Sequence, residues 1–600
     1  MKNKRILGLV TLAATTMFAL TACGGNNAGS NAAADPVSEA AFPSTTSNTN
    51  TATIENGTLE VAVVTGSPFT GIFSPALSNS AIDTNFISPT ATDSLFNVDP
   101  DTGRIIDGGA ANFSLNQETG VATITVNDGV TWSDGTSVSS DDILFTYYLI
   151  ANPDYTGPRF SDIIHVKGTE DYRNGKADSI SGLKRVDDRT VEVTYTQVSP
   201  SLLHPGGSGG TMSMVVPAHQ LKDIPVADLE SSDEVRFNPL SFGPFYITNV
   251  VPGESVEMTR NPYFWGEKPQ VETIITTALN PSTFVQAMEA RQFDLAISTP
   301  VNDFPHFQNI EGYELLGTWG GSYSYLGFNL GTFDAENSVV VPDENAKMAN
   351  VYLRRAMGHA IDQEALGESI FNGLRVPANV LLSPLAGDLR ASTDEVPGFG
   401  HGDEIELANQ ILDEAGFEKD EATGFRNNPD GTPLEITFAS MDGADFAEPL
   451  AQYHIQRWAE IGLNVSLLEG RLHDFTSFYD RIQADDPDID VFLAAWSTGI
   501  NPDPASLWGP NAAFNFVRYR SDEQDALIEA ISSEEAFDEE YRTQAFVDWH
   551  KYAFENAFAI PQLFRFELTP VSKRVTNFSV GRAENPGAVW AGVGLTAESR

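Results

Sequence analysis

The sequence predicts a protein of the α/β class with at least two hydrophobic cores. Strand and helix patterns alternate along its 600 residues without a fixed repeat, which favours an α/β architecture over a solenoid or a propeller. A chain of this length exceeds what one core supports. In its second half, apolar strands alternate with helices, which predicts a largely parallel sheet covered by helices.

Residues 1–22 predict an export signal that is removed, and Cys23 predicts a lipid anchor. Lys2, Lys4 and Arg5 precede an apolar run over residues 6–20, and Cys23 stands where an ordinary signal has its cleavage site. This arrangement is typical of a lipobox, after which the mature chain begins at an acylated cysteine on the outer face of a membrane. The alternative is a transmembrane anchor, although the run is shorter than the roughly 20 residues that a span needs.

Residues 23–53 predict a flexible tether behind the acylated cysteine. Beyond Cys23 they are almost entirely Gly, Asn, Ala, Ser and Thr, too small and polar to bury a core. A flexible chain of this length has an end-to-end distance of about 30 Å. The folded body is therefore expected to stay close to the membrane and to dock on a partner there.

The composition excludes several classes of partner. The formal net charge is −47, from 35 basic and 82 acidic residues, and such an excess repels nucleic acid and anionic lipid headgroups. The acidic surface serves either solvation or the collection of cationic ligands, and the sequence leaves both open. Cys23 is the single cysteine, so stability has to come from packing without disulfides.

Periodicity and turn residues predict the individual elements. Asp403 is expected to cap a helix, with Glu406 three residues on, and Gly416 to end it. His454 shares helical spacing with apolar residues, which predicts a position at the edge of a packed face. Strands are expected at 58–65, 121–126, 191–195, 293–298, 434–439, 463–468 and 489–496, and helices at 141–150, 282–291 and around Phe446, Leu450, His454 and Ile461.

No catalytic or metal centre is predicted. Residues 206–210 match the Gly-x-Ser-x-Gly pattern around Ser208, but they lack the strand before and the helix after that a nucleophile elbow needs. The nine histidines form no pair at helical spacing, so the chain lacks the usual arrangement of two histidine zinc ligands on one face of a helix. Phosphate-binding and calcium-loop patterns are absent from the sequence. The chain is therefore predicted not to be an enzyme and to need no cofactor.

Several segments resemble the family of solute-binding proteins that serve ATP-driven peptide importers, extracellular solute-binding protein family 5. The resemblance extends over about residues 58–590 and is particularly clear for the oligopeptide-binding lipoproteins of lactic-acid bacteria. The matching segments are 132–135 (Trp-Ser-Asp-Gly) with 140–142, 261–265 (Asn-Pro-Tyr-Phe-Trp), 354–356 with 360–362, 322–326, 470–472, 475–480 and 494–497. Trp132 and Trp265 are more simply read as core anchors.

The resemblance implies a two-lobe fold of the periplasmic-binding-protein type (class II, cluster C), closed by hinge motion. Lobe one is expected at about 54–325 and 566–600, with an extra subdomain inserted at about 93–198, and lobe two at about 326–565. Two hinge strands would then cross near 322–326 and 561–566.

The resemblance also implies the ligand and its contacts. An extended oligopeptide would pair with strand edges through its main chain, while its side chains enter roomy, hydrated pockets. The expected ligand-binding residues are Ile72, Phe73 and Ser74, then Trp496, Ser497 and Thr498, with Tyr323, Tyr325, Arg471 and Phe475 as candidates for the cleft wall. Each of these four has ordinary packing as its alternative.

One departure from the family bears on how the peptide is held. Members that clamp a short peptide by its amino terminus carry an aspartate where this chain has Gly499, so a receptor for longer peptides with lax length limits is expected. Asp503 is a candidate substitute for that charge. The implied partners are oligopeptides and the membrane subunits of an ABC permease, with the protein itself a monomer. A receptor for a peptide pheromone and a binder of nickel, haem or sugar remain alternatives.

Overall fold

The computed structural model describes residues 41–50, 53–78, 80–91, 93–207, 209–335, 337, 339–498 and 501–598. The predicted signal, most of the predicted tether and the residues Cys23, Ser208 and Gly499 lie outside this part. No helix within it has the length and apolar character needed to cross a membrane.

An 11-stranded sheet runs through the described residues, with β17, β16, β18, β12, β19, β11, β1, β10, β9 and β8 in that order and β15 beside β19. The expectation of parallel pairing is confirmed for the three strands that were predicted in the second half, β16, β17 and β18, but the sheet as a whole is mixed. β1 is parallel to β10 and β11, and β16 to β17 and β18, but β12 is antiparallel to β18 and β19, because residue periodicity carries no information on strand direction. The strands are β1 (Thr58–Val64), β8 (Phe245–Val251), β9 (Ser255–Arg260), β10 (Thr273–Leu279), β11 (Leu295–Ile297), β12 (Tyr313–Phe328), β15 (Arg375–Pro377), β16 (Glu435–Ala439), β17 (Asn464–Leu467), β18 (Val491–Ser497) and β19 (Ala559–Ser572).

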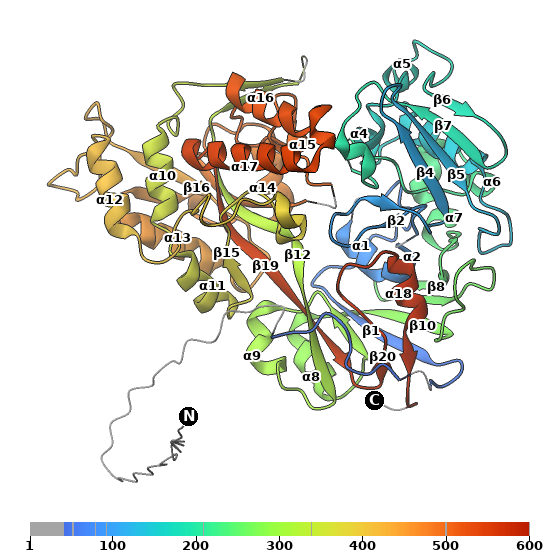
Figure 1. Ribbon diagram of the computed structural model, residues 1–600. Helices are drawn as coiled ribbons and strands as arrows, with labels where there is room; N and C mark the ends of the chain where they lie inside the picture. Colours follow the sequence, from blue (N-terminus) through green and yellow to red (C-terminus); the bar gives the residue numbers. More distant parts are fainter. Residues whose placement is uncertain are drawn as a thin grey trace, which may run out of the picture. The chain divides into compact units, whose positions relative to one another are not determined.

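Two long strands, β12 and β19, connect separate hydrophobic cores and lie side by side (Figure 1). The carboxyl-terminal part of β12 and the amino-terminal part of β19 belong to core A, which gathers buried residues between 323 and 564. Their other ends enter core C, which gathers buried residues between 59 and 595, and core D, which gathers buried residues between 62 and 568. Leu316 is buried in core C and Phe566 in core D. The ladder between the strands shifts register between Trp319 and Tyr325, at the change from one core to the next.

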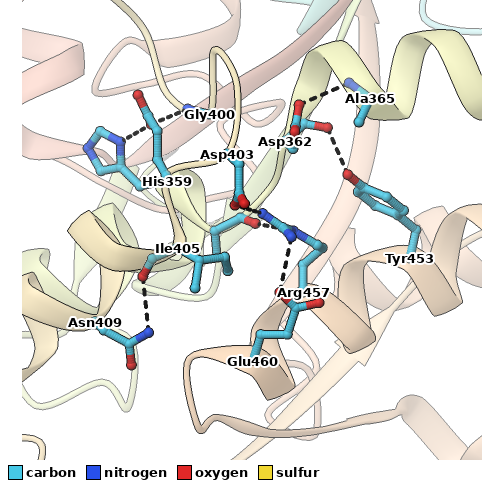
Figure 2. A network of polar contacts seen from close by, with 12 residues as sticks. His359, Asp362, Ala365, Gly400, Asp403, Ile405, Asn409, Tyr453, Arg457 and Glu460 are labelled. Atoms are coloured by element: carbon cyan, nitrogen blue, oxygen red, sulfur yellow. Dashed lines mark hydrogen bonds and ion pairs between the residues drawn. The ribbon is translucent and has the colours of Figure 1, made fainter.

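The helices of residues 351–556 pack on core A, and a polar network ties four of them together (Figure 2). Arg457 on α13 donates to Asp403 (2.7 Å) and Glu460 (3.0 Å), and His359 on α10 bonds Glu404 (2.7 Å) before α12. These helices are α10 (Val351–His359), α11 (Gln363–Phe371), α12 (Ile405–Glu414), α13 (Ala447–Glu460), α14 (Phe475–Gln483), α15 (Ala505–Trp508), α16 (Asp522–Ile531) and α17 (Glu539–Asn556).

Two details of this region differ from the sequence prediction. The N-cap of α12 is Glu404 and not Asp403, because the Asp403 carboxylate pairs with Arg457. His454 is fully buried and not at an edge, since Gln562 on β19 supplies its Nε2 with a partner at 3.2 Å. Gly416 follows the end of α12 with a φ of +83°, the left-handed conformation that favours glycine at a helix terminus.

Core B gathers buried residues between 76 and 242 around a four-stranded antiparallel sheet, β4-β5-β7-β6. Trp132 is buried there and its Nε1 donates to Asp142 (3.4 Å), while Asp142 and Ser139 form a capping box on α3. The Trp-Ser-Asp-Gly segment thus anchors a turn in the core. The strands are β4 (Ala111–Asn116), β5 (Val121–Val126), β6 (Leu183–Arg185) and β7 (Thr190–Thr194), and the helices are α3 (Ser140–Ala151), α4 (Phe160–Ile163), α5 (Thr169–Arg173), α6 (Ala218–Leu221) and α7 (Asp233–Arg236).

Short elements complete the described structure. The helices are α1 (Ala81–Phe86), α2 (Ser88–Ala91), α8 (Phe284–Glu289), α9 (Phe304–Phe307) and α18 (Pro586–Gly592), and the strands are β2 (Asn97–Val98), β3 (Ile105–Ile106), β13 (Gly331–Asp334), β14 (Val339–Pro342), β20 (Val575–Thr576) and β21 (Gly594–Leu595).

Candidate functional site

The sheet leaves one edge of β18 open near its carboxyl end. Thr498 N–H donates to Gly321 O (2.8 Å) on the β12 side. Because successive residues of an antiparallel strand alternate between bonded and non-bonded pairs, the N–H and C=O groups of Ala495 and Ser497 point to the opposite edge. β16 covers that edge only at Val491 and Phe492, and both Ala495 and Ser497 are exposed. Tyr479 Oη donates to Ala495 O (3.5 Å), so the Ala495 N–H and the two backbone groups of Ser497 are what the strand offers to a partner.

Two cavities share the lining residues Val98 and Pro586, and the second of them reaches the end of β18. Their volumes are about 390 Å³ and about 360 Å³, within the range of ligand pockets. Phe73 and Ser74 line the first cavity and Ser497 and Thr498 line the second, while Val98 lines both. The structure thus brings Phe73 and Ser74 to one cavity and Ser497 and Thr498 to its neighbour, whereas Ile72 and Trp496 line neither.

Within the segment 72–74, only Ser74 keeps a free backbone donor. Ile72 N–H donates to Asp83 Oδ2 (2.9 Å), and Phe73 N–H donates to Val235 O (3.2 Å). Ser74 N–H has no hydrogen-bond partner among the described residues, and neither has the buried Ser74 hydroxyl. Phe73 itself is buried in core C, so its ring serves packing.

Five aromatic rings form a continuous cluster next to the open edge. Phe475 contacts Tyr479 (4.8 Å between centroids), Tyr479 contacts Phe516 (6.0 Å), and Trp496 stacks on Phe516 (5.0 Å) and meets Phe514 (5.7 Å). The two ends of the cluster, Phe475 and Phe514, are 67% and 50% exposed. Rings that remain this exposed beside unpaired backbone groups provide an apolar surface for a ligand.

Tyr323, Tyr325 and Arg471 are not part of the open wall of the cavities. Tyr323 and Tyr325 on β12 are buried in core A, and burial raises the pKa of both phenols above the ordinary range. Their hydroxyls find no partner among the described residues. Arg471 lies at the surface and pairs with Glu469 (3.0 Å).

Asp503 is occupied by its own chain. Its Oδ2 accepts hydrogen bonds from Ser201 Oγ (2.9 Å) and Ser532 Oγ, and its Oδ1 from Ala505 N–H (2.9 Å). Ser201 precedes Leu202 of core B, so this carboxylate connects core B to the loop after β18. The Asp503 carboxylate thus already accepts three hydrogen bonds from its own chain, two of them at Oδ2.

A second contact joins the same regions. Arg104 Nη1 pairs with Glu539 Oε1 (2.7 Å) at the start of α17. Nearby, burial and then the positive charges of Arg542 and Arg104 lower the pKa of His204 to about 3, so this histidine is neutral. In the described part of the chain, no group of three or more His, Cys, Asp or Glu is placed to hold a metal ion.

Sequence reasoning missed Ala495, Tyr479, Phe514 and Phe516. Ala495 lies inside the segment that was named, and strand alternation together with the β12 register would have selected it. Tyr479 on α14 lies in the matching segment 475–480, but nothing there singled it out, and no motif marks Phe514 and Phe516, which come from a loop after α15.

Comparison with known proteins places the chain in a family. Residues 106–516 match the model for bacterial extracellular solute-binding proteins, family 5. The oligopeptide-binding protein OppA of Lactococcus lactis subsp. lactis is 33% identical over 88% of either chain, and AppA of Bacillus subtilis (strain 168) is 23% identical over 73% of this chain and 76% of that protein.

Solved structures agree with this assignment. Lactococcal OppA, complexed with an endogenous peptide in the closed conformation, superposes with a TM-score of 0.80 at 33% identity and covers 90% of this chain and all of its own (100%). AppA from Bacillus subtilis in complex with a nonapeptide matches in fold, with a TM-score of 0.69 at 17% identity over 91% of this chain and 100% of that chain. The protein belongs to the bacterial extracellular solute-binding proteins, family 5, and has their two-lobe α/β fold, as the sequence motifs predicted.

Proposed function

We propose that this protein is the extracellular, membrane-anchored substrate-binding component of an ABC peptide importer. It captures oligopeptides between its lobes and delivers them to the membrane subunits of the permease. The observation that carries the proposal is the open edge of β18, where the Ala495 N–H and the backbone groups of Ser497 point away from β12, with Ser497 at the wall of the second cavity. The likeness to lactococcal OppA over nearly the whole chain supports a peptide as the ligand.

Main-chain pairing explains how one receptor accepts many sequences. Every peptide residue carries an N–H and a C=O, so an extended peptide adds to the β18 edge whatever its side chains are. Those side chains enter the two cavities, where water satisfies polar groups of differing shape. The exposed rings of Phe475 and Phe514 offer contact area to apolar side chains.

Capture proceeds by closure of the two lobes. We place lobe one at about 54–325 and 566–600, its inserted subdomain at about 93–198, and lobe two at about 326–565, with β12 and β19 as the hinge strands. The bonds from Ser201 to Asp503 and from Arg104 to Glu539 join the lobes in the closed form. A peptide drives closure only by binding the closed form more tightly than the open one.

Acylation of Cys23 holds the protein, as a monomer, to the outer face of the membrane, and residues 24–53 let the body reach the permease. Since Gly499 supplies no acid and Asp503 is occupied, no ion pair at that place fixes the amino terminus of the peptide. The receptor therefore takes longer peptides with lax length limits. No cofactor and no covalent chemistry enter the cycle.

Mass spectrometry of ligands that co-purify with the protein, followed by calorimetry with the peptides found, tests the proposal. Peptides of varied sequence and micromolar or tighter affinity are expected. The proposal fails if mixed oligopeptides produce no heat and no compaction in X-ray scattering while a sugar, haem or a nickel complex produces both. A single peptide bound with strict selectivity would instead favour a pheromone receptor.

A further inference from the structure

Arg582 occupies a position in the second cavity that the proposed function does not use. It lies between β20 and α18, and Nη1 of its guanidinium donates to Leu385 O (2.7 Å), Pro100 O (3.1 Å) and Asp101 O (3.4 Å). These three carbonyls come from two distant parts of the chain and hold the group in place.

The other edge of the guanidinium is unused. Nε and Nη2 of Arg582 donate to no described residue, and neither atom is sealed from solvent. Arg582 is the one cationic residue among the described residues that line the second cavity. Ser497, which lines the same cavity, presents its backbone at the open edge of β18, so the free donors share a hollow with the proposed peptide site.

No carboxylate among the described residues accepts a hydrogen bond from Nε or Nη2 of Arg582. The Asp99 carboxylate accepts from Thr102 N–H (2.8 Å), Thr102 Oγ1 (2.9 Å) and Asp101 N–H (3.1 Å), and so faces its own turn. Burial lowers the pKa of Arg582, and the charges of Asp101 and Asp99 oppose that shift, but a guanidinium keeps its charge at neutral pH. A half-buried cation with two free donor positions is thus available.

The geometry points to Arg582 as a carboxylate-binding residue that reads an acidic group of the bound peptide. This inference rests on the proposed function and adds a ligand class to it. A planar carboxylate accepts two parallel hydrogen bonds from Nε and Nη2, the pairing for which a guanidinium edge is shaped. The acidic group is the carboxyl terminus of the peptide or an Asp or Glu side chain.

The test is calorimetry with one uncharged peptide sequence in three forms: a free acid, a carboxyl-terminal amide, and amides in which one internal Gln is replaced by Glu. We expect one carboxylate form to bind about 10- to 100-fold more tightly than the plain amide, as charged hydrogen bonds do. Tighter binding of the free acid would identify the carboxyl terminus as the group that Arg582 binds, and tighter binding of a Glu amide would identify a side-chain carboxylate.

Three variants locate the effect. Arg582→Gln is expected to bring the ratio of acid to amide affinity close to one. Arg582→Lys keeps the positive charge but loses the paired donors of the guanidinium, and it is expected to give an intermediate ratio. Arg185→Gln, at a surface arginine on β6 that pairs with Asp141 (2.9 Å), is the control and is expected to keep the full ratio.

The outcomes separate this inference from the proposed function. Equal binding of all forms by the unaltered protein, or an unchanged ratio in Arg582→Gln, overturns the carboxylate site and leaves peptide capture standing. Absence of binding by every form overturns peptide capture itself, and the carboxylate site with it. If Arg582→Gln does not fold, the peptide series on the unaltered protein and Arg582→Lys decide.

Discussion

Replacing Ser497 with proline removes one N–H from the open edge of β18 and leaves the native ladder intact. Since Thr498 N–H bonds Gly321 O, the pair of Ser497 with Ser322 is a non-bonded one, and no native hydrogen bond is lost. Proline is tolerated at strand edges whose N–H faces outward. Trp496, the preceding residue, already has the extended conformation that proline requires of it.

The magnitude follows from the loss of one main-chain hydrogen bond to the peptide. Such a bond contributes about 0.5–1.5 kcal/mol, which corresponds to about 2- to 13-fold in the dissociation constant. The loss should be equal for peptides of unrelated sequence, because the peptide contributes a carbonyl that every residue has. The free energy of unfolding should change by less than about 0.5 kcal/mol, as for a surface substitution.

Titration calorimetry with several unrelated peptides measures the first effect and thermal unfolding the second. Ser497→Ala keeps the N–H and should bind as the unaltered protein does. Thr498→Pro removes the bond to Gly321 and should lower the unfolding midpoint. Unchanged affinity of Ser497→Pro for every peptide, or a loss confined to one of them, would refute main-chain pairing at this edge.

Further changes probe other parts of the molecule. Burial raises the pKa of Asp93 from 3.8 to about 7. The unaltered protein therefore loses stability as pH rises from about 4 to 7, because the unfolded chain ionises this carboxyl first. Asp93→Asn should remove that pH dependence and raise the free energy of unfolding by at most about 4 kcal/mol at pH 7, and parallel pH profiles of denaturant unfolding for the two proteins would contradict this. Phe514→Ala should lower the affinity for peptides with apolar side chains about fivefold, the effect of about 1 kcal/mol of lost burial, and should leave the unfolding midpoint unchanged. Calorimetry with apolar and polar peptides measures this, and equal losses for both kinds of peptide would speak against an apolar subsite. Ser201→Ala removes a hydrogen bond to Asp503 and should shift the peptide-free protein toward an open envelope in X-ray scattering, whereas an unchanged envelope argues against this closing contact. Acetylation of the peptide amino terminus should change affinity by less than threefold, and a large uniform loss in a titration would indicate an amino-terminal clamp.

Local patterns located most of the elements. The strand predicted at 58–65 is β1 (58–64), the one at 121–126 is β5, and the one at 489–496 is β18 (491–497). Alternation of apolar residues reports burial within a segment, and these segments are buried as the alternation requires. The helix cap predicted at Asp403 was wrong, because the Asp403 carboxylate pairs with Arg457, a residue of another helix.

The candidate site was predictable as a segment and not as a set of atoms. The resemblance to the family selected 496–498, but which backbone groups are free depends on the pairing of Thr498 with Gly321 on β12. Tyr323 and Tyr325 were expected at the cleft wall, yet both rings are buried in core A. No pattern in the sequence indicated that the Ser201 hydroxyl would donate a hydrogen bond to the Asp503 carboxylate.

The sequence by itself determined the family, the α/β class, the approximate elements and the absence of a motif for catalysis, because these depend on residue type and on spacing along the chain. The tertiary structure alone decided which edge of β18 stays open, which rings gather beside it and which charged groups remain unpaired in the cavities. Those properties arise where residues far apart in the chain meet, and a hydrogen bond or a ring contact between distant segments leaves no periodic trace in either segment.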